Sequence, residues 1–104
     1  MTQKEINGQM ITFDDEGFMT DPGVWSEDVA RTIAVELDME LTDRHFQVLQ
    51  FMRQHFEANG EAPSLRKIKN DSGVGTKELY KLFPKGPAKK AARLAGLGKP
   101  QGCI

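Results

Sequence analysis

Between residues 26 and 96, apolar side chains recur at intervals of three and four, in segments separated by capping residues, glycine and proline. This spacing is typical of amphipathic helices, and the breaks separate one helix from the next. Ser26, Thr42 and Thr76 are the expected N-caps, and Pro84 ends the fourth segment. The pattern predicts five successive helices, over about residues 27–37, 43–59, 64–70, 77–83 and 87–95.

The residues before this array have a different pattern. Residues 4–20 read KEINGQMITFDDEGFMT, in which Asn7-Gly8 lies between two short apolar runs. Asn-Gly in that context is a hairpin signal, so a small antiparallel meander is expected there. The predicted fold class is therefore α+β and mostly helical, with a short N-terminal β meander packed on about five helices.

The length of 104 residues fits one small domain. We expect that domain over residues 1–96, followed by a flexible arm over residues 97–104, where Gly98, Pro100 and Gly102 disfavour helix and strand. No apolar run approaches the roughly 20 residues of a membrane span, and no signal-peptide core follows Met1. A soluble, cytoplasmic protein without a membrane partner is expected.

Charge is distributed unevenly along the chain. Residues 1–43 carry eleven acids against two bases, residues 44–83 seven bases against four acids, and residues 84–104 five bases and no acid. A basic end of this kind indicates either a solvated helix face or a surface for an anionic partner.

Cys103, the only cysteine, lies in the expected arm. A single thiol excludes an internal disulfide, and His45 and His55 are too far apart in sequence for metal-ligand spacing, so no metal and no cofactor are expected. Glycines and proline do not build a core around the thiol, and the arm from Gly96 to Ile104 could reach roughly 30 Å. A thiol presented in this way suits reaction inside the active site of a partner.

The C-terminal quarter of the chain contains a distinctive motif. It comprises LYKLFPKGPAK over residues 79–89, AGL over 95–97, Lys99-Pro100, and Gly102-Cys103-Ile104. This combination resembles the DsrC/TusE family of sulfur carriers, and the resemblance continues upstream through 15–18, Trp25, 41–42 and 62–63. The family has a small α+β fold with a short meander on a helical array.

The resemblance implies that Cys103 accepts a persulfide sulfur from one sulfurtransferase and passes it to the next, as a carrier with transferase character. Further residues near the thiol are expected to assist the transfer, since basic side chains suit an acidic docking surface and Tyr80 belongs to the family motif. Residues expected to contact partners are Lys85, Lys89, Arg93, Lys99, Pro100, Gly102 and Ile104. Residues expected to support the arm are Tyr80, Phe83 and Pro84.

Two-cysteine members of the family carry a second thiol eleven positions earlier and work with dissimilatory sulfite reductase, whereas this chain has Ala92 there. The single cysteine is more similar to TusE, which implies a TusBCD- or DsrEFH-like donor and a tRNA thiouridylase as acceptor, for 2-thiolation of the wobble uridine. A single-cysteine DsrC-like role in sulfur oxidation stays open as an alternative, and sulfite reductase is a less favoured partner.

An alternative of another class is a helix-turn-helix regulator. Residues 64–83 combine a short helix, a glycine-bearing turn and a second helix, with five cations along them. Against direct nucleic-acid binding, the second helix carries two lysines and no Arg, Asn or Gln to read base edges. The five cations are Arg66, Lys67, Lys69, Lys77 and Lys81.

Overall fold

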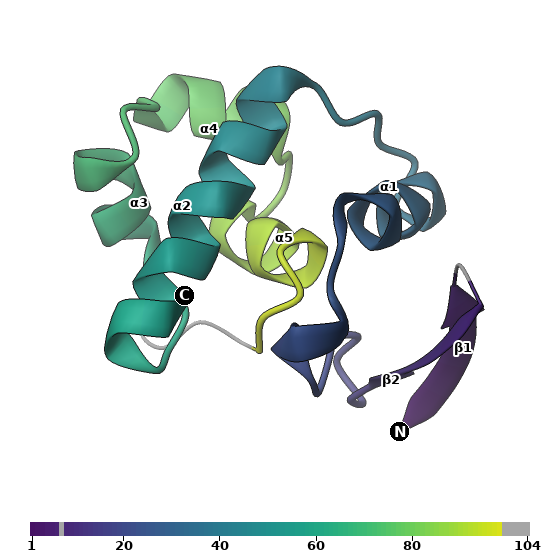
Figure 1. Ribbon diagram of the computed structural model, residues 1–104. Helices are drawn as coiled ribbons and strands as arrows, with labels where there is room; N and C mark the ends of the chain where they lie inside the picture. The colour runs from purple at the N-terminus through teal and green to yellow at the C-terminus, as the bar shows by residue number, and fades with distance from the viewer. Residues whose placement is uncertain (7, 99–104) are drawn as a thin grey trace.

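The computed structural model describes residues 1–6 and 8–98. Over these residues, a β-hairpin and one turn of 3-10 helix precede five α-helices, as Figure 1 shows. The α+β, mostly helical fold predicted from the sequence is confirmed. The elements are β1 Thr2–Ile6, β2 Gln9–Phe13, η1 Pro22–Val24, α1 Glu27–Glu36, α2 Asp43–Asn59, α3 Leu65–Asp71, α4 Thr76–Leu82 and α5 Pro87–Leu94.

The sheet lies at one edge of the molecule (Figure 1). β1 and β2 pair antiparallel with Ile6 opposite Gln9, and a single bridge joins Phe13 to Met19. The expected meander is thus a two-stranded hairpin with one further bridge. Alternation buries Ile11 and Phe13 against the helices and leaves Met10 on the outer face.

Local capping explains where the helices begin. The Ser26 hydroxyl accepts a hydrogen bond from the Val29 N–H at 3.3 Å, and Ser64 does the same for Lys67 at 3.3 Å. In α4, the N-cap is Gly75 and Thr76 is already helical, so the predicted cap at Thr76 is off by one residue. Helix α2 ends at Gly60, whose φ of 78° is left-handed and suits glycine.

Helix α5 is the centre of the array. It contacts α1, α2, α3 and α4, and Figure 1 shows it between α1 and α2. Its inward face is built mainly from buried alanines, which let neighbouring helices approach closely. These are Ala88, Ala91 and Ala92, together with Ala95 directly after the helix.

A buried histidine connects α2 to the end of α4. The Thr42 N–H donates to His45 Nδ1 at 3.0 Å, so the ring proton is on Nε2, which donates to the Leu82 carbonyl at 2.8 Å. The ring of Phe83 meets the imidazole edge-on, with centroids 5.1 Å apart. His45 therefore fixes the chain at the point where it turns from α4 toward α5.

Candidate functional site

Five of the residues predicted for the site lie outside the residues that the structure describes. They are Cys103, Lys99, Pro100, Gly102 and Ile104. The described part of the site is therefore the end of α5, from which the chain continues toward Cys103, and the surface around the α4–α5 turn.

A tryptophan holds the C-terminal end of α5. Trp25 Nε1 donates a hydrogen bond of 2.6 Å to the Leu94 carbonyl, one of the carbonyls that the helix leaves without an internal partner. The indole also lies against Gly96, where an added Cβ would be 2.6 Å from Trp25 Cδ1. Because Gly96 also has a φ of 74°, only glycine fits this contact without strain.

An arginine from α2 completes this contact. Arg53 donates from Nη1 to the Ala95 carbonyl at 2.7 Å and from Nη2 to the Pro22 carbonyl at 3.0 Å. Its guanidinium carbon lies 4.4 Å from the centroid of the Trp25 ring, a cation–π contact. Burial lowers the pKa of Arg53 below its ordinary value, and nearby Glu57 partly opposes this shift. We refer to Trp25, Arg53 and Gly96 as the clamp.

Leu97 is the last anchor before the undescribed residues. It was expected in the arm, which the sequence placed over residues 97–104. In the structure, its side chain is fully buried and its N–H donates to the Ala92 carbonyl at 3.0 Å. The packed core thus extends past Gly96 to Leu97. The six residues that follow Leu97, up to Cys103, could extend at most about 20 Å.

The residues expected to support the arm differ in how deeply they are buried. Phe83 is buried against His45, Pro84 is exposed in the turn, and Tyr80 is 49% exposed on α4. Their role toward the arm stays a prediction.

Two of the expected partner-binding residues differ in their surroundings. Lys89 is exposed. Arg93, in contrast, donates from Nη2 to the Glu16 carbonyl and lies 5.3 Å from the centroid of the Phe18 ring. Arg93 thus connects α5 to the segment after the hairpin. A role of either residue in partner binding stays a prediction.

A groove opens beside the α4–α5 turn, at the N-terminal end of α5. It has a volume of about 890 Å³ and lies between α3, α4 and the start of α5. Lys85 and Tyr80 both line it, so the groove brings together one expected partner-binding residue and one expected arm-supporting residue. Its lining is Ser64, Leu65, Arg66, Lys69, Thr76, Tyr80, Lys85, Gly86, Pro87 and Ala88.

An ion pair fixes α4 relative to α2. Arg44 donates to the two carboxylate oxygens of Glu78, from Nε at 2.7 Å and from Nη2 at 3.0 Å. Hydrogen bonding to Arg44 lowers the pKa of Glu78, and the same contact raises that of Arg44. This bidentate contact uses the only acid on the second helix of the helix-turn-helix-like segment.

Sequence reasoning did not identify Arg53, and it noted Trp25 only as part of the family resemblance. A signal was present for Arg53, which lies four residues after Leu49 and three before Phe56, on the apolar stripe of its helix. A charged residue on such a stripe needs a buried polar partner. The partner carbonyls, however, are visible only in the folded chain.

The described residues contain neither a metal-ligand cluster nor a membrane-spanning helix. Within residues 1–6 and 8–98, no cluster of three or more potential metal ligands occurs. In the same part of the chain, no helix has the length and apolar character needed to cross a membrane.

Comparison with known sequences gives a consistent result. Residues 5–104 match the family described as "DsrC like protein". Sulfurtransferase TusE of Pectobacterium atrosepticum is 37% identical over 108 residues, covering 96% of this chain and 98% of the relative. A sulfurtransferase TusE homolog of Haemophilus influenzae is 38% identical, covering 95% and 97%.

Solved structures agree with the sequence comparison. The NMR structure of Allochromatium vinosum DsrC superposes with a TM-score of 0.85 at 35% identity, over 98% of this chain and 97% of that one. The oxidized gamma-subunit of the dissimilatory sulfite reductase (DsrC) of Archaeoglobus fulgidus gives 0.84 at 35% identity, over 99% and 100%.

Proposed function

The chain belongs to the family of DsrC-like proteins, and from this premise we propose that it is a TusE-like sulfur-relay protein that carries a persulfide on Cys103. The observation that carries the proposal is the similarity to sulfurtransferases TusE across at least 95% of the chain. The motif around residues 79–89 and Cys103 lie within the matched residues 5–104.

The proposed transfer conserves atoms and electrons. The Cys103 thiolate attacks the outer sulfur of a donor persulfide, a new S–S bond forms on Cys103, and the donor leaves as a thiolate. An acceptor thiolate then attacks the outer sulfur on Cys103, which is released as a thiolate. An ordinary cysteine pKa of about 8.5 leaves a few per cent of thiolate at neutral pH, so activation by the partner's site suffices.

The presence of Ala92 favours a role in sulfur transfer between proteins over a role with sulfite reductase. Its side chain is fully buried in α5, at the position where two-cysteine members of the family carry their second thiol. Cys103 therefore has no internal thiol to react with, and its persulfide can pass only to another molecule.

The partners of the proposed relay are sulfurtransferases. We infer a TusBCD- or DsrEFH-like donor and, as acceptor, a tRNA thiouridylase that thiolates the wobble uridine. The cytoplasm is the fitting compartment, because a carrier thiol must stay reduced between transfers. A DsrC-like role in sulfur oxidation is the second candidate, because the chain is also similar to proteins named DsrC, among them that of Allochromatium vinosum at 35% identity.

Intact-mass spectrometry tests the proposal directly. The protein and its Cys103→Ser variant are incubated with a cysteine desulfurase and its relay proteins. The expected result is a reductant-sensitive gain of one sulfur that is absent from Cys103→Ser. Failure to gain sulfur from any donor, while Cys103 still alkylates, would contradict the proposal.

A second stage separates the two candidates. The loaded protein is offered to a tRNA thiouridylase with tRNA, or to enzymes of sulfur oxidation. Formation of thiolated uridine with loss of the extra sulfur supports the TusE-like role. Discharge only to the oxidation enzymes would assign the DsrC-like alternative.

A further inference from the structure

The segment over residues 64–90 carries an excess of cations that its own acids do not neutralise. It contains eight lysines and arginines but only two acids, Asp71 and Glu78. Both acids are already paired, Asp71 with Lys67 at 2.5 Å and Glu78 with Arg44 at 2.7 Å.

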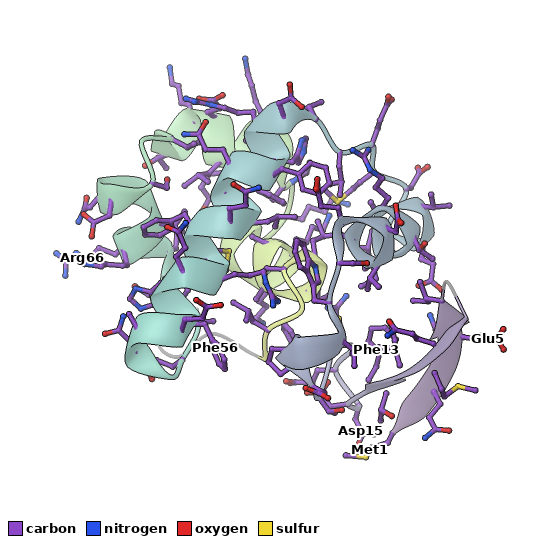
Figure 2. The ribbon with its side chains drawn as sticks, viewed as in Figure 1. Met1, Glu5, Phe13, Asp15, Phe56 and Arg66 are labelled. Atoms are coloured by element: carbon purple, nitrogen blue, oxygen red, sulfur yellow. The ribbon has the colours of Figure 1, made fainter. Side chains whose placement is uncertain are left out.

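Three of the remaining cations line the groove between α3, α4 and α5. They are Arg66, Lys69 and Lys85, all exposed, and none of their side chains has an ion pair or hydrogen bond within the described residues. Figure 2 shows Arg66 pointing outward from α3. Among the residues that the structure describes, no acid lines the groove, so the three positive charges are available to an anion.

The rest of the groove is largely apolar. Leu65 and the half-exposed Tyr80 come from its two flanking helices, and Pro87 and Ala88 come from the start of α5. A cavity of about 890 Å³ lies within the range of binding clefts for compact ligands or short peptide segments. Cations around an apolar floor suit an occupant that carries both negative charge and apolar side chains.

The backbone at Lys85 adds an independent observation. Lys85 adopts a φ of 62°, one of two left-handed conformations at non-glycine residues among those described. This conformation costs a lysine about 1 kcal/mol or more, and glycine or asparagine normally occupies it. The turn therefore places a cationic side chain, rather than glycine or asparagine, on the lining of the groove, at a cost in backbone strain.

We propose that this groove is a docking site for an acidic, apolar-containing segment of a partner protein in the sulfur relay. This inference rests on the proposed function and deepens it by naming the surface that holds the partner while Cys103 reacts. The start of α5 lines the groove, and its end leads through the clamp to Leu97. The eight residues of α5 span about 12 Å, so a single rigid helix connects docking surface and arm.

The shape of the surface favours a peptide over a nucleic acid. The cations surround a recess with an apolar floor, whereas duplex recognition uses a protruding helix with side chains that read base edges. Helix α4 presents Lys77 and Lys81, and its Glu78 is held by Arg44. Beyond the two lysines, α4 carries no Arg, Asn or Gln for bidentate contacts with base edges.

The test is a titration of the full chain, kept reduced and followed by amide chemical shifts. The probe is the end-blocked pentapeptide Glu-Leu-Glu-Leu-Glu at 0.15 M salt, where charges more than about 8 Å apart are largely screened. The same peptide with glutamine in place of glutamate is the uncharged control. We expect shifts confined to residues 64–69, 76–80 and 85–88 with the acidic peptide, and at least tenfold weaker binding of the control.

Charge reversal provides matched variants. Lys69→Glu with Lys85→Glu should weaken the acidic peptide at least tenfold. Lys77→Glu with Lys81→Glu makes the same change in charge outside the groove lining and should weaken it less than threefold. Equal losses in both variants, or shifts spread over all lysines, would overturn the proposal. Tighter binding of an RNA or DNA duplex to the same amides would overturn the assignment to a peptide.

Sulfur loading keeps the two hypotheses apart. All variants are also loaded on Cys103 with a small-molecule polysulfide and weighed by intact mass. The groove variants should load like the unaltered protein, because loading by a small donor needs no docking. If the protein bound the peptide specifically but never gained sulfur, the proposed relay function would be contradicted and the docking site would stand. If it gained sulfur but did not bind the peptide, the docking site would be contradicted and the relay function would stand.

Discussion

The two ends of helix α5 are built in opposite ways. At its C-terminal end, Trp25 and Arg53 bind the Leu94 and Ala95 carbonyls, and Gly96 and Leu97 are packed tightly. At its N-terminal end, Gly86 caps the helix without a side-chain hydrogen bond, Lys85 is conformationally strained, and a groove lies open.

This difference indicates that one end of α5 stabilises the fold and the other end is available for binding. The clamped end uses its polar groups internally, so the point from which the chain continues toward Cys103 is fixed. The cations at the open end have no side-chain partner within residues 1–6 and 8–98, so they are available to another molecule. Substitutions at the clamp should therefore cost stability, and substitutions at the groove should cost binding.

The largest effect is expected from Gly96→Ala. The new methyl would be 2.6 Å from Trp25, on a backbone with a φ of 74°. The cost of the steric clash and the cost of the left-handed backbone are therefore both incurred. Together they should lower the free energy of unfolding by about 2–4 kcal/mol, measured by urea denaturation. Gly98→Ala is the control, since its Cβ meets nothing within 4 Å. If both variants lost the same stability, the clamp would not be rigid.

Arg53→Ala and Arg66→Ala form the direct comparison of the two ends. Loss of two charged hydrogen bonds and a cation–π contact should cost about 2–3 kcal/mol at Arg53. Arg66→Ala should change stability by less than about 0.5 kcal/mol but weaken the acidic pentapeptide. Denaturation and peptide titration of both variants measure the two effects. If the two variants were equally stable, the proposed difference between the two ends of α5 would be contradicted.

Lys85→Asn should separate stability from binding within the groove itself. Asparagine tolerates a φ of 62° better than lysine, so the free energy of unfolding should rise by about 0.5–1 kcal/mol. Peptide affinity should fall because a cation is removed. The same substitution at Lys89, inside α5, is the control and should lower stability slightly through helix propensity. Destabilisation by Lys85→Asn would show that its backbone is unstrained.

Glu78→Gln is expected to have the smallest effect, and one that depends on pH. Arg44 holds the pKa of Glu78 below its ordinary value in the folded chain. The pair therefore stabilises the fold above about pH 4.3, the ordinary value, and this contribution is lost as the pH falls through the folded pKa. The thermal midpoint of Glu78→Gln should lie slightly below that of the unaltered protein at pH 7 and coincide with it at pH 2. An equal difference at both pH values would contradict this.

Prediction from sequence succeeded where the determinants are local. Ser26 caps α1 as predicted, and Pro87 lies in the first turn of α5 as predicted. Helix α3 begins one residue later than expected, with Ser64 as its cap. The Thr76 cap was off by one residue because Gly75 adopts the capping conformation without a side chain. Leu97 was placed in the arm because the glycines and proline around it disfavour regular structure, although a residue outside any helix can still be buried.

By itself, the sequence determined the helical array, the hairpin, the family motif and the presence of a single thiol at Cys103, because each depends on neighbouring residues and their spacing. Only the tertiary structure decided how α5 is held and what its two ends present. The clamp joins residues 69 and 42 positions apart in the chain, and the groove forms where three helices meet. Such contacts depend on the packing of distant segments, which no local pattern of residues records.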